Sequence, residues 1–237
     1  ILYSSGTTGK PKCITHKVGG TLIQIFKEQK LHCDVRPGDR VFFFTTLGWM
    51  MWNWLVNALA CEAALVLYDG SPFYPDGDVL WRYADDVDMT LFGTSAKFID
   101  ALKNAKSQPM NQFDLSAMRM LCSTGSVLAP ESFDYVYQDI KQDICLASMS
   151  GGTDIASCFA LGSPILPVYR GEIQCRGLGM AVEVFDDDGH PLQGDTGELV
   201  CTQTFPSQPV FFWGDDSGEK YHNAYFARFD NAWHHGD

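Results

Sequence analysis

Short apolar runs alternate with amphipathic segments over the first two thirds of the chain. The apolar runs have the length of buried strands, and the segments between them repeat apolar residues at the spacing of one helix face. Such alternation indicates an α/β fold: a doubly wound, mostly parallel sheet with helices on both faces. The predicted strands are 41–45, 64–68, 89–92, 118–122 and 144–147, and the predicted helices are 19–28, 50–61, 79–85, 96–105 and 130–140.

The pattern changes after residue 157. Helical periodicity is nearly absent there, and prolines and turns such as Asp188-Gly189 divide the sequence. We therefore expect an α/β part over 1–157 and a smaller β-rich, barrel-like subdomain over 158–237. Its predicted strands are 172–175, 182–185 and 198–202.

The stretch 41–68 invites a transmembrane interpretation, because Glu62 is its only formal charge. However, threonines and asparagines interrupt it, and Gly48 breaks it. A strand, a turn, a buried helix and a second strand fit this pattern better. We therefore expect no membrane insertion.

Composition narrows the range of partners. Of 237 residues, 46% are hydrophobic and 19% charged, which suits a globular protein with a sizeable core. The 17 basic and 29 acidic residues give a net charge of −12, so nucleic acid is a poor partner and small-molecule substrates are expected. The eight cysteines form no Cys-x-x-Cys pair and have mostly apolar neighbours, which indicates reduced thiols and a cytoplasmic location.

The segment 3–12, Tyr-Ser-Ser-Gly-Thr-Thr-Gly-Lys-Pro-Lys, is the most informative part of the chain. Its small residues let backbone N–H groups converge on an anion, while hydroxyls and lysines add donors and charge. The spacing of its glycines differs from that of a Walker A loop. The alternative is an ordinary surface turn. We predict a polyphosphate cradle made by Ser4, Ser5, Gly6, Thr7, Thr8, Gly9, Lys10 and Lys12.

This segment resembles the phosphate loop of the adenylate-forming superfamily, which includes acyl-CoA synthetases, luciferases and peptide-synthetase adenylation domains. Other segments resemble the family's motifs in the same order along the whole chain. They are 69–76, 125–131, 150–154, 197–200 and 233–237. Within the superfamily, 48–54 and 148–155 are most similar to the branch that ligates acetoacetate to coenzyme A. This sequence departs from the family's pattern at Ser150, Asp154 and the pair His234-His235.

The resemblance implies ATP-dependent formation of an acyl-adenylate, followed by transfer of the acyl group to CoA. It also implies that Thr153, Asp154 and Lys10 are catalytic. One carboxylate together with phosphate oxygens is a normal Mg²⁺ site, so Asp154 is the predicted metal ligand, although it could instead cap a following helical turn. The other predicted nucleotide-binding residues are Gly125, Ser126, Val127, Ser150, Gly151, Gly152 and Asp237.

The acyl group is expected to contact Trp49, Met50 and Met51, although a buried aromatic helix is the alternative interpretation of this cluster. Two other functions stay open: ligation of acetate, propionate or a similar short acid, and nucleotide binding without turnover.

The chain has neither an initiator Met nor a polar tail. We expect an internal piece of a longer protein, without its N-terminal segment and C-terminal lid domain, and with little ligase activity alone.

Overall fold

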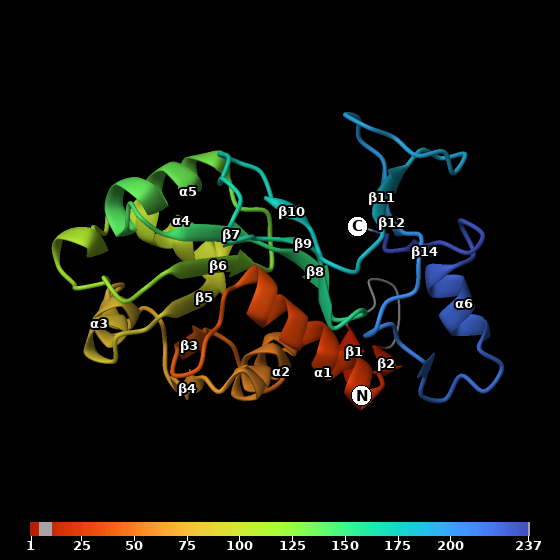
Figure 1. The fold of residues 1–237 in the computed structure, drawn as a ribbon, viewed down its shortest axis with the longest axis horizontal. Helices are drawn as coiled ribbons and strands as arrows, with labels where there is room; N and C mark the ends of the chain where they lie inside the picture. Colours follow the sequence, from red (N-terminus) through yellow and green to blue (C-terminus); the bar gives the residue numbers. More distant parts are fainter. Residues whose placement is uncertain (5–10, 237) are drawn as a thin grey trace. The chain divides into compact units, whose positions relative to one another are not determined.

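The computed structural model of the chain describes residues 1–4 and 11–236 (Figure 1). The chain forms two compact units that do not follow its order. We call them the composite unit, made of Ile1–Ile25, Gly151–Phe159 and Arg176–Asp237, and the sheet unit, made of Phe26–Ser150 and Ala160–Cys175. The expected boundary after residue 157 falls inside strand β9 (Ser157–Leu161).

The sheet unit is built on a five-stranded parallel sheet with the order β4-β3-β5-β6-β7. The strand order reverses between β3 and β5, and in open α/β sheets ligands bind outside the carboxyl ends of the strands at such a point. The strands are β3 (Arg40–Phe43), β4 (Ala64–Val66), β5 (Leu91–Ser95), β6 (Met120–Thr124) and β7 (Cys145–Ser148).

One face of this sheet packs against three helices. Successive side chains of a strand point to opposite faces, and Phe42, Phe92 and Leu121 lie on this one. Trp81 stacks on Phe92 with the ring centroids 4.5 Å apart, and both side chains are fully buried. The helices are α3 (Val79–Asp86), α4 (Ala96–Ala105) and α5 (Pro130–Tyr135).

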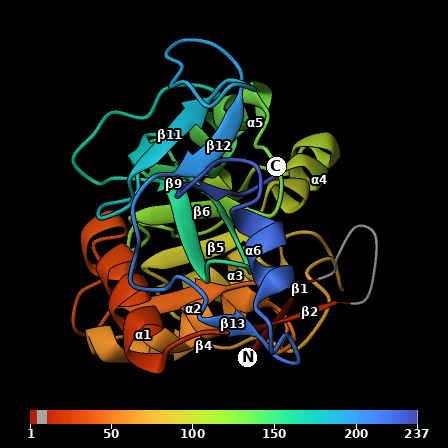
Figure 2. The ribbon, with the colours of Figure 1, turned by 90° about the vertical axis from the view of Figure 1, so that its right-hand side faces the viewer.

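The opposite face packs against α2 (Met50–Val56), as Figures 1 and 2 show. Phe43 of β3 meets the ring of Trp54 edge to face at 5.8 Å. A Cβ added to Gly93 would lie 2.0 Å from the Phe43 ring, so only glycine fits there. Helices on both faces of a parallel sheet confirm the predicted fold class.

The described residues also form helix α1 and four short helical elements. Helix α1 (Val18–Lys27) matches the helix predicted at 19–28, and a π-helical turn, η1 (Glu28–His32), follows it. The predicted helices 50–61 and 130–140 each change type part-way, continuing as the 3₁₀ helix η2 (Asn57–Cys61) and the π-helix η4 (Val136–Ile140). A short 3₁₀ turn, η3 (Pro109–Asn111), follows α4.

The composite unit contains short antiparallel sheets. One has the order β1-β2-β13 and the other β11-β12-β14, while β8, β9 and β10 form a further sheet in the order β10-β9-β8. The strands are β1 (Leu2–Ser4), β2 (Lys12–Thr15), β13 (Phe211–Phe212), β11 (Val182–Phe185), β12 (Glu198–Cys201), β14 (Trp233–His234), β8 (Ser150–Gly152) and β10 (Cys175–Arg176).

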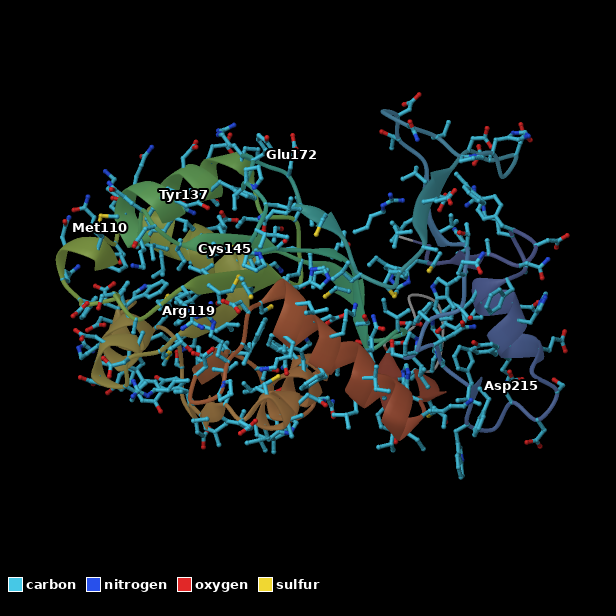
Figure 3. All side chains as sticks on the ribbon, in the orientation of Figure 1. Met110, Arg119, Tyr137, Cys145, Glu172 and Asp215 are labelled. Carbon is cyan, nitrogen blue, oxygen red and sulfur yellow. The ribbon has the colours of Figure 1, made fainter. Side chains whose placement is uncertain are left out.

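Helix α6 (Glu219–Tyr225) corrects the expectation that helix is nearly absent after residue 157. It is too short to produce a clear helical period in the sequence. Its first turn is held by Asp215, whose carboxylate accepts from the backbone N–H groups of Lys220 and Tyr221 at 3.3 and 2.9 Å (Figure 3). The strand predicted at 172–175 is also wrong, since only its last residue belongs to β10.

Two other expectations can be compared with the structure. No helix in the described part of the chain combines the length and apolar character needed to cross a membrane. The eight cysteines are all free.

Candidate active site

Asp154 lies at the centre of a polar cluster in the composite unit. Lys12, the first residue of β2, donates from Nζ to Asp154 Oδ1 at 2.7 Å. Tyr225, the last residue of α6, donates its hydroxyl to the same oxygen. Among the described residues nothing hydrogen-bonds to Oδ2, so this oxygen keeps its lone pairs for a ligand. The fold thus joins three distant segments at one carboxylate.

Asp154 is ionised at neutral pH. Burial alone would raise the pKa of this carboxyl, but the hydrogen bonds from Lys12 and Tyr225 and the charge of Lys12 lower it below its usual value. The pKa of Tyr225 is raised by burial and by the adjacent carboxylate, so its hydroxyl stays a proton donor. The cluster therefore contains an anion, a cation and a fixed neutral donor.

Aromatic rings hold Tyr225 in place. Its ring stacks on Trp233 with the centroids 3.7 Å apart and an angle of 16° between the planes. Phe212 and Tyr221 meet the same ring edge to face, at 5.6 and 5.4 Å. The Lys12 ammonium lies over it at 5.1 Å, which is within the range of a cation–π contact. The hydroxyl of Tyr225 is therefore fixed by packing.

The turn that carries Asp154 is held from below by a buried serine. Ser207 donates from Oγ to the carbonyl of Ile155 at 2.6 Å, and His16 Nδ1 donates to the carbonyl of Ser207 at 2.8 Å. A turn at 153–156 leads directly into β9, so Asp154 caps no helix and that alternative interpretation is wrong. The position of the carboxylate follows from the turn and its supports.

Close packing requires glycine at position 151 and leaves little room for a side chain at position 152. A Cβ on Gly151 would lie 2.1 Å from the carbonyl oxygen of Ser157. A Cβ on Gly152 would lie 2.9 Å from the ring of His235. One departure from the family pattern, the histidine before Gly236, thus packs closely against Gly152.

The predicted phosphate loop joins β1 to β2. These strands pair antiparallel, with Ser4 opposite Lys12. The loop residues between them, and Asp237, are outside the described part of the chain. Because Lys12 contacts Asp154, the exit of the loop lies at the carboxylate. The loop residues concerned are Ser5, Gly6, Thr7, Thr8, Gly9 and Lys10.

Other predicted site residues lie in the sheet unit. The loop Gly125–Val127 follows the carboxyl end of β6, where Gly125 has a φ of +85° and Val127 is exposed. Trp49 precedes α2 and is 59% exposed. A cavity of about 470 Å³ opens at the carboxyl ends of β3 and β4. From α2 it is lined by Trp52 and Leu55; Trp49, Met50 and Met51 are not among its lining residues.

The contact between Tyr225 and Asp154 is not predictable from the sequence. No spacing relates this tyrosine to Asp154 or Lys12, because α6 brings it back from a distant segment. Segment 221–226 is rich in aromatic residues. This composition indicates a packed cluster but assigns no function to Tyr225.

A magnesium ion fits this donor set. The described residues contain no group of three or more His, Cys, Asp or Glu side chains that could hold a metal by themselves. Mg²⁺ is commonly bound through one or two carboxylates together with substrate phosphates, so a single carboxylate is sufficient. The ionised Asp154, whose Oδ2 makes no hydrogen bond to the described residues, has the required chemistry.

Comparison with known proteins decides the family. The family model described as "AMP-binding enzyme" matches residues 1–206. The chain belongs to the AMP-binding enzyme family. All of this AMP-binding chain aligns with the acetoacetyl-coenzyme A synthetase of Rhizobium meliloti, at 60% identity and covering 36% of that protein. The acetoacetyl-CoA synthetase of Danio rerio is 52% identical over the whole chain and 35% of its own length.

A solved structure gives the same result. The acetoacetyl-CoA synthetase from Streptomyces lividans superposes with a TM-score of 0.95 at 47% identity, over 100% of this chain and 37% of that one. The AMP-binding chain therefore spans about a third of the length of the relatives it matches.

Proposed function

We propose that this chain is the nucleotide-binding part of an enzyme that joins acetoacetate to coenzyme A with ATP. The observation that carries the proposal is the Lys12–Asp154 pair at the exit of the predicted phosphate loop. The choice of acid is supported by the relatives, which are named acetoacetyl-CoA synthetase and match the chain over its whole length. The free cysteines favour a reducing compartment, and we propose the cytosol.

The reaction requires no nucleophile from the protein. The carboxylate of acetoacetate attacks the α-phosphorus of ATP, and the bond to the β-phosphate oxygen breaks, which gives acetoacetyl-adenylate and pyrophosphate. The thiol of CoA, having lost its proton, then attacks the acyl carbon and AMP leaves. The residues of the chain accelerate both steps by binding, orienting and stabilising charge.

Each group of residues has a proposed task. Lys12 and Lys10 bind phosphate oxygens with their ammonium groups, and Thr153 donates its hydroxyl to the α-phosphate. Asp154 would hold Mg²⁺, which when bound offsets the negative charge of the phosphates. Gly125–Val127 flank the adenine, and Asp237 accepts from the ribose hydroxyls. The acyl group is contacted by Trp49, Met50 and Met51.

A panel of acids tests the proposal. Pyrophosphate release by the protein that contains this chain is measured with acetoacetate, acetate, propionate and butyrate, each with ATP, Mg²⁺ and CoA. We expect the highest kcat/KM with acetoacetate. A higher value for acetate or propionate would assign the protein to short-chain acids in general. ATP binding without pyrophosphate release for any acid would leave only a nucleotide-binding module.

A further inference from the structure

Tyr225 hydrogen-bonds directly to Asp154, and the proposed function gives this side chain no task. It is 2% exposed, and its hydroxyl donates to the carboxylate oxygen that Lys12 also contacts. The two donors differ in freedom. The Lys12 side chain is 32% exposed and carries its ammonium group on a flexible four-carbon chain. The Tyr225 ring, in contrast, is stacked on Trp233.

We propose that Tyr225 is a positioning residue for the metal-bound nucleotide: its hydroxyl fixes Oδ1 of Asp154 so that Oδ2 stays available to the cation. Lys12 donates a hydrogen bond to Oδ1 when no nucleotide is bound, and it can leave Asp154 to bind a phosphate. Tyr225 keeps its hydrogen bond to Oδ1 when the nucleotide binds. This inference rests on the proposed function, because it assigns a task at the same carboxylate.

The geometry around Asp154 supports these different tasks for Lys12 and Tyr225. A carboxylate on a short side chain rotates about χ2, which is a broad torsion, and each orientation presents a different oxygen. One immobile donor on Oδ1 restricts that rotation. The rings of Phe212, Tyr221 and Trp233 hold the donor, and Ser207 holds the turn beneath the carboxylate. The metal-facing oxygen is thus set before the metal arrives.

The test is the Mg²⁺ dependence of ATP binding, measured by calorimetry at a series of free Mg²⁺ concentrations in the protein that contains this chain. Tyr225→Phe keeps the ring and removes the hydroxyl. We expect the Mg²⁺ concentration for half-saturation to rise about tenfold, as for the loss of one hydrogen bond to a charged group. ATP affinity in EDTA should change less than twofold, because no metal is then positioned.

Tyr221→Phe is the matched control. This tyrosine lies in the same helix and the same aromatic cluster, but its hydroxyl donates to the carbonyl of Pro209 at 2.8 Å. We expect its Mg²⁺ half-saturation to equal that of the wild type. An equal rise in both variants would show a general effect of packing and overturn the proposal. So would a Tyr225→Phe value within twofold of the wild type.

A third variant keeps the proposal testable if Tyr225→Phe does not fold. Replacing Tyr225 by 4-aminophenylalanine retains the ring and an N–H donor at the same place. We expect its half-saturation within threefold of the wild type, and a tenfold rise would contradict the proposal. If the wild type itself binds ATP without any dependence on Mg²⁺, the proposed function fails. If the wild type depends on Mg²⁺ and Tyr225→Phe changes nothing, only this inference fails.

Discussion

The sheet unit and the composite unit use their buried polar side chains in different ways. In the sheet unit, Glu28 accepts from the indole N–H of Trp54 at 3.1 Å, and Gln29 donates to the Trp54 carbonyl at 2.6 Å. Both side chains are fully buried and fix α2. In the composite unit, Asp154 is fixed on one oxygen and open on the other.

The difference distinguishes buried polar groups that hold the fold from those that serve a ligand. A buried polar group must be hydrogen-bonded, and a purely structural one gains most when every site is used. Asp154 is held at Oδ1, whereas its Oδ2 has no hydrogen bond from the described residues and is not among the fully buried atoms. We take this accessible oxygen, in a side chain only 15% exposed, as the mark of a ligand site.

The largest expected effect is a loss of stability caused by a substitution in the sheet unit. Trp81→Ala removes a fully buried ring that stacks on Phe92, and should lower the free energy of unfolding by about 3–5 kcal/mol. The Mg²⁺ half-saturation of the molecules that stay folded should not change, because Trp81 packs within the sheet unit, whereas Asp154 belongs to the composite unit. Urea denaturation and calorimetry check the two halves of this prediction, and a changed half-saturation would contradict the comparison.

Lys12→Ala acts on the composite unit. It removes the cation from Asp154 and, by our proposal, from the phosphates, so ATP affinity should fall by about 10- to 100-fold, as for hydrogen bonds to charged groups. Lys12→Arg should recover part of this loss because it keeps the charge. Titration calorimetry with ATP measures both. An unchanged affinity in Lys12→Ala would show that the lysine only pairs with the carboxylate.

Asp39 provides a structural carboxylate for comparison. Burial would raise its pKa, but hydrogen bonds from Arg119 at 2.7 and 3.1 Å and from the backbone N–H of Arg36 lower it. Stability from a lowered pKa is present above the unfolded value of about 4 and is lost as pH falls through the folded value. Asp39→Asn should cost about 1–3 kcal/mol at pH 7.

The same substitution should flatten the acid limb of the stability curve, measured by urea denaturation from pH 7 to pH 3. The Mg²⁺ dependence of ATP binding should stay as in the wild type. A stability curve that keeps its full slope below pH 4 would show that Asp39 is not the group responsible.

The smallest expected effect uses two neighbouring glycines of α1. A Cβ on Gly19 meets nothing within 4 Å, so Gly19→Ala should stabilise by about 0.5–1 kcal/mol through the lower entropy of the unfolded chain. A Cβ on Gly20 would lie 2.0 Å from the carbonyl oxygen of Pro206, so Gly20→Ala should destabilise. Thermal melting compares them, and equal shifts would refute the packing given for Gly20.

The sequence predicts the sheet unit better than the composite unit, for a physical reason. Helix 96–105 has the predicted bounds, because its apolar period is a local signal. The strands shift by only a few residues. In the composite unit, α6 is too short for a period, and contacts with distant segments determine its place.

The same limit applies to the candidate site. Lys12 and Asp154 were each singled out by local motifs, but their 2.7 Å contact depends on the fold. Tyr225 belongs to no sequence motif that indicates a function. Its position follows only from the packing of Trp233 and Phe212 around it. The chemical role of a residue can thus be inferred from the local sequence, whereas its contacts with distant segments cannot.

The most direct test of the account is Asp154→Asn, with Asp39→Asn as its matched control. ATP binding is titrated at low and at saturating free Mg²⁺ in the protein that contains this chain. We expect Mg²⁺ to tighten ATP binding in the wild type and in Asp39→Asn but to have little effect in Asp154→Asn. Equal tightening by Mg²⁺ in all three proteins would contradict the assignment of the metal-bound nucleotide to Asp154.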